Sequence, residues 1–302
     1  MNVVFMGTPD YAKEILKSLI EDKEIKISLV LTQPDRPVGR KKILTAPPVK
    51  ELSIDNSIEV IQPISLRDKE IEEKIKSLKP DFIVVAAYGQ LLPKNILDIA
   101  PCINLHASIL PQYRGASPIQ QGLINADEYL GVTAMLMDEG LDSGDILGFR
   151  YIKRIEANRL DIAMDKLSKE AAKLTISILK NYDKLNPIPQ NNLVSSKCPK
   201  IKKEDGLIKL NSADEVYRKY CAFYGWPGVY LENGLKLLDI DLIETNSKNK
   251  EGEILEIIKN GVKVGCKRGS IVIKELQPKS KSKMLAKAYL AGQRRSVGDN
   301  IL

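Results

Sequence analysis

His106 is the only histidine among the 302 residues, and it lies in a segment that reads Ile-Asn-Leu-His-Ala-Ser-Ile-Leu-Pro from residue 103. The apolar run around it predicts a buried strand that ends near the histidine. In open α/β sheets, ligands bind at the carboxyl ends of the strands. Asn104 lies two residues earlier, so the alternation of side chains along a strand places both on one face. The pair is a candidate site, although a lone histidine beside an apolar run is also often a hydrogen-bonded core residue.

A turn rich in glycine and carboxylates follows at residues 137–145, which read Met-Asp-Glu-Gly-Leu-Asp-Ser-Gly-Asp. This composition is typical of an exposed turn, and without the histidine a solvated acidic turn is the preferred interpretation. If Asp142 folds back toward His106, its carboxylate would orient the imidazole and fix its tautomer. The acidic turn is therefore the second part of the candidate site.

Asn104, His106 and Asp142 together suit acyl transfer to an amine. Attack of the amine on an acyl carbon produces an oxyanion, which the asparagine amide and a protonated imidazole can stabilise. The amine must lose a proton and the leaving nitrogen must gain one, and an imidazole–carboxylate pair can move both. Ser108 lies nearby in the sequence, but no G-x-S-x-G motif surrounds it, so a serine nucleophile is not indicated.

The elements that would position these residues are short apolar runs separated by amphipathic stretches. This alternation predicts an α/β domain with a doubly wound, mostly parallel sheet. The expected strands lie at residues 1–7, 25–33, 81–89, 103–110, 131–138 and 145–154. The expected helices lie at residues 11–20, 67–78 and about 160–182.

The last third of the chain has a different pattern. Prolines and asparagines from residue 186 predict a linker over 186–205, which separates a domain over 1–185 from one over 206–302. A helix is expected from Ser212, followed by short strands joined at Asn-Gly and Arg-Gly turns. Such strands predict a small β-barrel similar to an OB-fold, a frequent platform for nucleic acids.

The positive charge is concentrated in this last third. Residues 197–302 contain 21 Lys and Arg against 13 Asp and Glu, while the rest of the chain is nearly neutral. The asymmetry favours a polyanionic partner such as nucleic acid, although a solvated lysine-rich surface is an equal alternative. The four cysteines are scattered, and no stretch reaches the roughly 18 apolar residues of a membrane span. We therefore expect a soluble cytoplasmic protein with reduced thiols and no metal site.

The segment from residue 103 to 120 resembles the signature of folate-dependent formyltransferases, which combines Asn-x-His, Ser-Leu-Leu-Pro and a downstream Arg-Gly. The resemblance implies a Rossmann-like formyltransferase domain in which Asn104, His106 and Asp142 are catalytic. It also implies 10-formyltetrahydrofolate as the formyl donor, with no metal. The residues implied to bind this reduced folate are Ser108, Ile109, Leu110 and Pro111, then Tyr88, Gly89, Gln90 and Leu91, and Asp138.

A proline-rich segment with consecutive cations, at residues 32–50, resembles the insertion with which one branch of the family engages methionyl-tRNA. Its prolines and Gly39 indicate an exposed loop, and its cations suit phosphate contacts. The C-terminal domain resembles the one appended in that branch, and Trp226 is expected to anchor its core, with a base-stacking platform as the less favoured alternative. The resemblance thus implies the initiator methionyl-tRNA as partner, contacted by Arg36, Arg40, Lys41, Lys42, Lys279, Lys281 and Lys283.

Two alternatives stay open on the sequence. One is formyl transfer to a sugar nucleotide or another small amine, which would not need the basic segment. The other is a non-catalytic RNA-binding homologue, which would tolerate loss of the catalytic residues. No coiled-coil or apolar seam stands out, so we expect a monomer.

Overall fold

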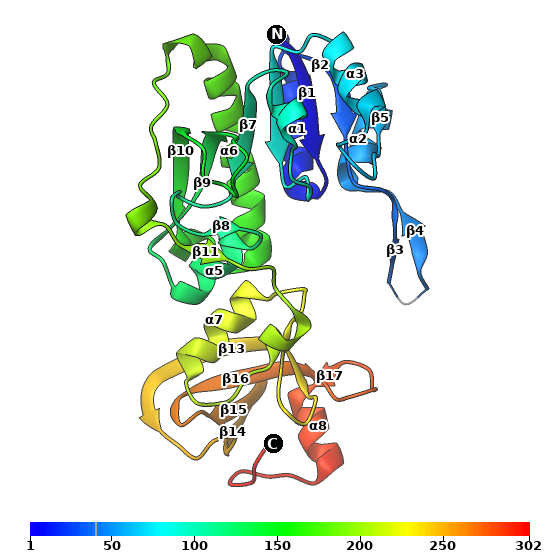
Figure 1. The fold of residues 1–302 in the computed structure, drawn as a ribbon. Coiled ribbons are helices and arrows are strands. Elements are labelled where there is room, and N and C mark those ends of the chain that lie inside the picture. The colour runs from blue at the N-terminus through cyan, green and yellow to red at the C-terminus, as the bar shows by residue number, and fades with distance from the viewer. Residues whose placement is uncertain (40) are drawn as a thin grey trace. The chain divides into compact units, whose positions relative to one another are not determined.

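The computed structural model describes residues 1–39 and 41–302 and divides into two compact units (Figure 1). The first comprises Met1–Pro118, Glu128–Ala157 and Ile162–Cys198. The second comprises Ile119–Asp127, Asn158–Asp161 and Pro199–Leu302. Among the described helices, none combines the length and apolar character needed to cross a bilayer.

A seven-stranded sheet forms the centre of the first unit, in the order β10-β9-β7-β6-β1-β2-β5. The five strands from β7 to β5 in this order are parallel, and β9 and β10 continue the sheet in antiparallel pairing. The predicted α/β class with a doubly wound, mostly parallel sheet is confirmed. The strands are β1 (Asn2–Gly7), β2 (Lys26–Leu31), β5 (Val60–Ile61), β6 (Phe82–Ala86), β7 (Cys102–His106), β9 (Tyr129–Leu136) and β10 (Ile146–Lys153).

Helices pack on this sheet through apolar stripes. In α1, Tyr11, Ile15 and Leu19 recur at helical spacing and are buried. Ile75 of α3 and Ile96 of α4 belong to a fully buried cluster with side chains of β1, β2 and β6. The helices are α1 (Asp10–Glu21), α2 (Pro48–Asp55), α3 (Lys69–Ser77), α4 (Lys94–Leu97) and α6 (Leu160–Asn181), with 3-10 turns η1 (Arg154–Glu156), η2 (Tyr182–Lys184) and η3 (Asn192–Val194).

The proline-rich segment of residues 32–50 is more ordered than an irregular loop. Strands β3 (Arg36–Val38) and β4 (Ile43–Thr45) pair in an isolated antiparallel hairpin, and α2 already begins at Pro48. Every described residue of the two strands is exposed. Proline has no N–H to donate, and it is tolerated in an edge strand because no ladder hydrogen bond is required of its nitrogen there. The predicted exposure therefore holds, while the expectation of a loop without strands was wrong.

The second unit is built on a six-stranded antiparallel sheet, in which β12, β13, β16, β15 and β14 follow one another and β17 pairs with β16. Ser212 caps the helix that was expected from this residue, because its hydroxyl accepts from the backbone N–H of Glu215. The strands are β12 (Val229–Tyr230), β13 (Lys236–Lys248), β14 (Ile254–Ile258), β15 (Gly261–Gly265), β16 (Arg268–Gln277) and β17 (Met284–Leu285). The helices are α5 (Pro118–Asn125), α7 (Ala213–Ala222), α8 (Ala286–Gln293) and the 3-10 turn η4 (Lys203–Gly206).

Trp226 does not anchor the core of this unit. Its side chain is 59% exposed, whereas the neighbouring Phe223 is 2% exposed and Pro227 is buried. The core instead takes aliphatic side chains from the sheet, together with Tyr220 from α7. The expectation from sequence was wrong because Phe223 and Pro227 provide the anchoring that the single tryptophan was assumed to provide.

Candidate active site

The structure brings Asn104, His106 and Asp142 together at the carboxyl end of β7. Asn104 and His106 are on the same face of the strand and are 9% and 6% exposed. Asp142 comes from the turn between β9 and β10, and β9 is the neighbour of β7 in the sheet. The amide Nδ2 of Asn104 donates to Asp142 Oδ1 at 3.3 Å, and the same oxygen lies 3.6 Å from His106 Nδ1. One carboxylate oxygen thus faces both strand residues.

The imidazole of His106 is oriented by a backbone carbonyl on its other side. Its Nε2 lies 2.9 Å from the carbonyl oxygen of Tyr113, which can only accept, so Nε2 carries a hydrogen. In the neutral ring, Nδ1 then holds the lone pair and points toward Asp142. The arrangement provides one position for a mobile proton at the end of β7.

One backbone group and one side-chain amide hold the Asp142 carboxylate. The N–H of Gly115 donates to Oδ2 of Asp142 at 2.8 Å, so both carboxylate oxygens have partners. Asp142 itself has a φ of 50°, which is uncommon for a residue other than glycine. Such a conformation persists where the surrounding contacts determine it. The aspartate is therefore held by its neighbours in a geometry that the isolated turn would not favour.

Gln190 and Arg114 supply these contacts, and sequence reasoning missed both. The Nε2 of Gln190 donates to the carbonyl oxygens of Asp142 and Gly144 at 3.0 and 2.7 Å. The guanidinium of Arg114, which is 9% exposed, donates twice to Oε1 of Gln190 at 2.9 and 2.7 Å. Arg114 stands in the motif that carries the family resemblance, but nothing in the sequence marks Gln190, which lies among prolines and asparagines.

Cys198 contacts the same carbonyl oxygen that orients His106. Strand β11 (Lys197–Cys198) pairs in parallel with β8 (Arg114–Gly115), and the Cys198 thiol donates to the same Tyr113 carbonyl oxygen that faces His106, at 3.1 Å. Burial raises the pKa of this thiol, so it stays protonated and serves as a donor, not as a nucleophile. A Cβ on Gly115, whose φ is 126°, would lie 2.3 Å from the Cys198 carbonyl oxygen. Only glycine fits this approach.

The segment that follows β7 has a fixed backbone. The hydroxyl of Thr133 donates to the carbonyl oxygen of Ser108 at 2.7 Å and accepts from the N–H of Leu110 at 3.1 Å. The Ser108 hydroxyl donates to the carbonyl oxygen of Gln112 at 2.6 Å. Ile109 rests on Gly131, where a Cβ would lie 2.4 Å from Ile109 Cγ1. The predicted folate segment from Ser108 to Pro111 thus presents a pre-arranged main chain beside His106.

Comparison with known proteins identifies the family that this arrangement belongs to. A family model described as formyl transferase matches residues 1–179, and one described as formyl transferase, C-terminal domain, matches residues 200–294. The chain belongs to the formyl transferase family. The two matched regions together contain all of the predicted catalytic, folate-binding and tRNA-binding residues, while Gln190 and Cys198 lie between them.

Curated relatives align with this formyl transferase over nearly its whole length. The methionyl-tRNA formyltransferases of a Nitratiruptor species and a Sulfurovum species are 53% and 52% identical, each over 99% of both chains. The N-formyltransferase of Helicobacter canadensis, solved with folinic acid and dTDP-3-aminofucose, has a TM-score of 0.67 at 16% identity and covers 90% of this chain and 98% of its own. HypX from Aquifex aeolicus, solved with tetrahydrofolic acid, has a TM-score of 0.64 at 16% identity, and the chain spans 48% of it. These solved structures share the fold.

In this formyl transferase the side chains of the other predicted folate residues differ widely in exposure and in their contacts. The Tyr88 ring is 2% exposed in the apolar core, where burial raises its pKa to about 12, so the ring does not face a ligand. Gly89 follows with a φ of 88°, Gln90 donates to the Pro63 carbonyl oxygen at 3.1 Å, and Leu91 is 71% exposed. Asp138 shapes the acidic turn, because its carboxylate accepts from Gly140 N and Ser143 Oγ at 2.9 and 3.0 Å.

The predicted tRNA-binding cations occupy the hairpin in the first unit and one segment in the second. Arg36, Lys41 and Lys42 are exposed on the β3–β4 hairpin, while Arg40 lies outside the described residues. Lys50 differs from these, because it pairs with Asp35 at 2.8 Å and holds the pKa of that carboxyl below its usual range. Between β16 and β17 the exposed lysines are Lys279, Lys281 and Lys283, the last 3.7 Å from Glu275.

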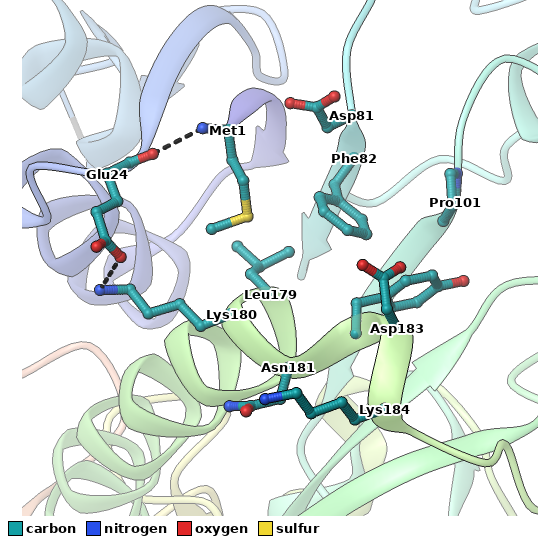
Figure 2. A pocket seen from close by; sticks show the side chains of 11 residues that line it. Met1, Glu24, Asp81, Phe82, Pro101, Leu179, Lys180, Asn181, Asp183 and Lys184 are labelled. Atoms are coloured by element: carbon teal, nitrogen blue, oxygen red, sulfur yellow. Dashed lines mark hydrogen bonds and ion pairs between the residues drawn. The ribbon is translucent and has the colours of Figure 1, made fainter.

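A cavity of about 620 Å³ lies elsewhere in the first unit (Figure 2). It is lined by Asp81 and Phe82 at the start of β6, by Pro101 just before β7, and by the end of α6. Because β7 is five residues long, the cavity and His106 are separated by roughly 16 Å along the strand. This cavity is therefore distinct from the candidate active site, which lies at the opposite edge of the sheet.

Proposed function

We propose that this chain transfers the formyl group of 10-formyltetrahydrofolate to the amino group of initiator methionyl-tRNA, which yields the N-formylmethionyl-tRNA used in translation initiation. The observation that carries the chemistry is the cluster of Asn104, His106 and Asp142 at the carboxyl end of β7. The acceptor rests on relatives of the same length, 53% and 52% identical, that are named methionyl-tRNA formyltransferase.

Asn104 suits the stabilisation of the oxyanion that forms when the amine attacks the formyl carbon. Its amide has two hydrogens, and one of them is directed at Asp142. The second is available to the developing negative charge. The Asn104 side chain is 9% exposed, and a fixed donor contributes most to oxyanion stabilisation where little water competes for it.

His106 suits the proton transfer. Its Nε2 hydrogen is engaged by the Tyr113 carbonyl oxygen, so the lone pair on Nδ1 takes the proton that the attacking amine loses. The Asp142 carboxylate, 3.6 Å away, stabilises the imidazolium. The same proton then passes from Nδ1 to the nitrogen that leaves as the carbon–nitrogen bond of the donor breaks. In this assignment His106 carries the proton, and Asp142 orients and stabilises it.

The chemistry of the surrounding groups fits a reduced folate. We assign the pterin to the segments around Gly89 and from Ser108 to Pro111 on the family resemblance, and the bonds of Thr133 to the Ser108 carbonyl oxygen and the Leu110 N–H keep the second segment in place. Leu91, 71% exposed on the loop after β6, gives an apolar surface for a flat ring. When bound, the folate supplies the activated formyl group, and the protein contributes orientation, oxyanion stabilisation and a proton carrier.

The hairpin and the lysines after β16 suit contacts to the phosphates of tRNA. Arg36, Lys41 and Lys42 are exposed cations on a projecting hairpin, and we include Arg40 because it lies in the same run. Phosphate contacts of this kind add affinity and salt dependence without reading bases. We further propose that the protein acts as a monomer in the cytoplasm, where reduced folates and charged tRNA are available.

The experiment that tests this function is transfer of labelled formyl from 10-formyltetrahydrofolate to methionyl-tRNA, with free methionine and an amino-sugar nucleotide as parallel acceptors. We expect label on the tRNA and not on either small amine. Label on the sugar nucleotide would retain the chemistry and refute the assignment of the acceptor. No transfer to any acceptor, while tRNA still binds, would indicate a non-catalytic RNA-binding protein.

A further inference from the structure

Trp226, the only tryptophan of the chain, is held at the surface on a well-anchored turn. Its side chain is 59% exposed, while the adjacent Pro227 is buried. The turn lies between α7 and β12, and Gly228 N donates to the Phe223 carbonyl oxygen at 3.0 Å. Gly225 and Gly228, with φ of 84° and 72°, adopt left-handed conformations that other residues disfavour. An indole is thus presented to solvent from a defined base.

A basic segment runs beside this turn. A Cβ on Gly206 would lie 2.2 Å from the Gly228 carbonyl oxygen and 3.2 Å from Pro227 Cγ, so η4 packs directly on the turn. Tyr230 of β12 fastens the same contact by donating from its hydroxyl to the Lys203 carbonyl oxygen at 3.2 Å. The exposed side chains that precede or begin η4 are Lys200, Lys202 and Lys203.

These lysines are available for an external anion. Within the described part of the chain, none of the three forms an ion pair. Two carboxylates, Glu204 and Asp205, follow them in η4, and that of Asp205 accepts from the backbone N–H of Lys202 at 2.6 Å. Three lysines against these two carboxylates leave residues 200–205 with a net side-chain charge of +1.

Tyr224, a second aromatic residue of the turn, has a cation on its ring, whereas over residues 1–39 and 41–302 Trp226 has none. The guanidinium of Arg159 lies 3.9 Å from the centre of the Tyr224 ring, so one face of that ring is covered. Trp226 has no ring or cation contact with any residue that the structure describes. The Trp226 indole is thus exposed and, in the described part of the chain, has neither the ring partner nor the cation partner that Tyr224 has.

We infer that Trp226 is a stacking site for an unpaired nucleobase of the tRNA substrate, with Lys202 and Lys203 at the phosphates that flank this base. The inference rests on the proposed function. An indole face binds any base, because every base has a π-face, and single-stranded segments are bound by aromatic residues interleaved with cations. An apolar protein partner would account for the indole but not for the lysines beside it.

The sole tryptophan makes the test direct, because all indole fluorescence of the wild-type chain arises from Trp226. Emission and acrylamide quenching are recorded during titration with methionyl-tRNA, while binding is followed independently by anisotropy of labelled tRNA. We expect emission to be quenched, and access of acrylamide to be lost, in parallel with the anisotropy. Saturating anisotropy with unchanged emission and access would overturn the inference and leave the proposed function intact. Absence of tRNA binding would refute both.

Variants separate stacking from charge. Trp226→Ala should weaken tRNA binding between about 5- and 150-fold, the range for loss of one stacked base. It should leave the salt dependence unchanged, because no phosphate contact is lost. Trp226→Phe should retain most of the affinity, while Trp226→Leu should behave like the alanine variant. Lys202→Ala should instead reduce the salt dependence.

The matched control is Ile243→Ala, which removes another exposed apolar side chain, 50% accessible, in the same unit. It should bind tRNA like the wild type. Equal affinity of Trp226→Ala and wild type would overturn the inference, as would equal affinity of the leucine and phenylalanine variants at a level near wild type.

Discussion

Replacing Gln190 by alanine should slow catalysis although the side chain touches no reacting atom. Gln190 connects the buried guanidinium of Arg114 to two carbonyl oxygens of the acidic turn, those of Asp142 and Gly144. The alanine variant loses these four hydrogen bonds together, along with a longer contact from Gln190 Nε2 to Met135 Sδ at 3.9 Å. The Asp142 carboxylate keeps its contacts with Gly115 and Asn104, but its main chain, at a φ of 50°, loses the partner that holds this conformation.

The magnitude follows from these contacts. A hydrogen bond to a charged group contributes about 1.5–3 kcal/mol and one between neutral groups about 0.5–1.5 kcal/mol. Water can replace some of them, since Gln190 is half-buried, so we expect a loss of about 2–4 kcal/mol in the free energy of unfolding. A displacement of a catalytic group by about 1 Å can cost on the order of 100-fold in rate. We therefore expect kcat to fall roughly 10- to 100-fold.

The assay is steady-state transfer with each substrate varied in turn, at a temperature where the variant is folded by circular dichroism. A positioning role predicts a lower kcat with nearly unchanged KM for folate and for tRNA. Gln190→Glu should not restore the rate, because it keeps the acceptor for Arg114 but places a carboxylate against two carbonyl oxygens. The matched control is Asn181→Ala, which removes an exposed hydrogen bond from a side-chain amide to the Ser177 carbonyl oxygen, 2.9 Å long.

The result that would refute this reasoning is a kcat within twofold of wild type in Gln190→Ala, measured together with strong loss in Asp142→Ala. The acidic turn would then hold its geometry without Gln190. Faster hydrogen exchange of amides 138–145 in the folded variant is the complementary readout, because a purely global destabilisation would accelerate exchange throughout the unit.

Three further predictions follow from the site, the hairpin and the buried thiols. His106→Gln should lower kcat by about 10²–10⁴-fold, the usual contribution of general acid–base catalysis, while direct binding shows tRNA affinity within twofold of wild type. Replacing Lys41 and Lys42 together by alanine should weaken tRNA binding and reduce its salt dependence, with folate affinity unchanged; an unaltered salt slope would contradict a phosphate contact. Burial raises the pKa of Cys102 and Cys266 to about 12, so both should resist alkylation at pH 8 until the protein unfolds. Because the unfolded thiols ionise near pH 8.5, their contribution to stability should be present below that pH and decrease as the pH rises toward 12, as urea unfolding at several pH values can show.

The pattern of apolar residues predicted the sheet well because each buried strand is a short run of apolar residues. The apolar runs around Val4, Val84 and Ile103 became β1, β6 and β7, and the histidine fell at the end of its strand as expected. The proximity of Asn104 and His106 follows from alternation alone. The position of Asp142 was predicted only conditionally, because the return of a turn to a neighbouring strand depends on the order of the sheet.

The groups that hold the site could not be predicted from residue types. The partner of His106 Nε2 is a carbonyl oxygen of Tyr113, and every residue has such an oxygen. The Cys198 thiol donates to the same oxygen, and nothing in the spacing of the four cysteines indicates this contact. The prediction for Trp226 was wrong for a different reason. A large apolar residue is usually buried, but here Phe223 and Pro227 are buried and Trp226 is exposed.

The segment after α6 is where composition and physical role diverge most. Its prolines and asparagines indicate irregular structure, and that structure completes the wall of the site. Ile188 exchanges two backbone hydrogen bonds with Ile146 of β10, and the Ser196 hydroxyl accepts from the N–H of Tyr113 at 2.9 Å. Together with Gln190 and Cys198, these contacts hold both the Tyr113 carbonyl behind His106 and the main chain of the acidic turn. The groups proposed to be catalytic come from β7 and the acidic turn, but their geometry depends on this later segment. A fragment that ended with α6 would therefore retain all three residues proposed to be catalytic and lose the contacts that align them.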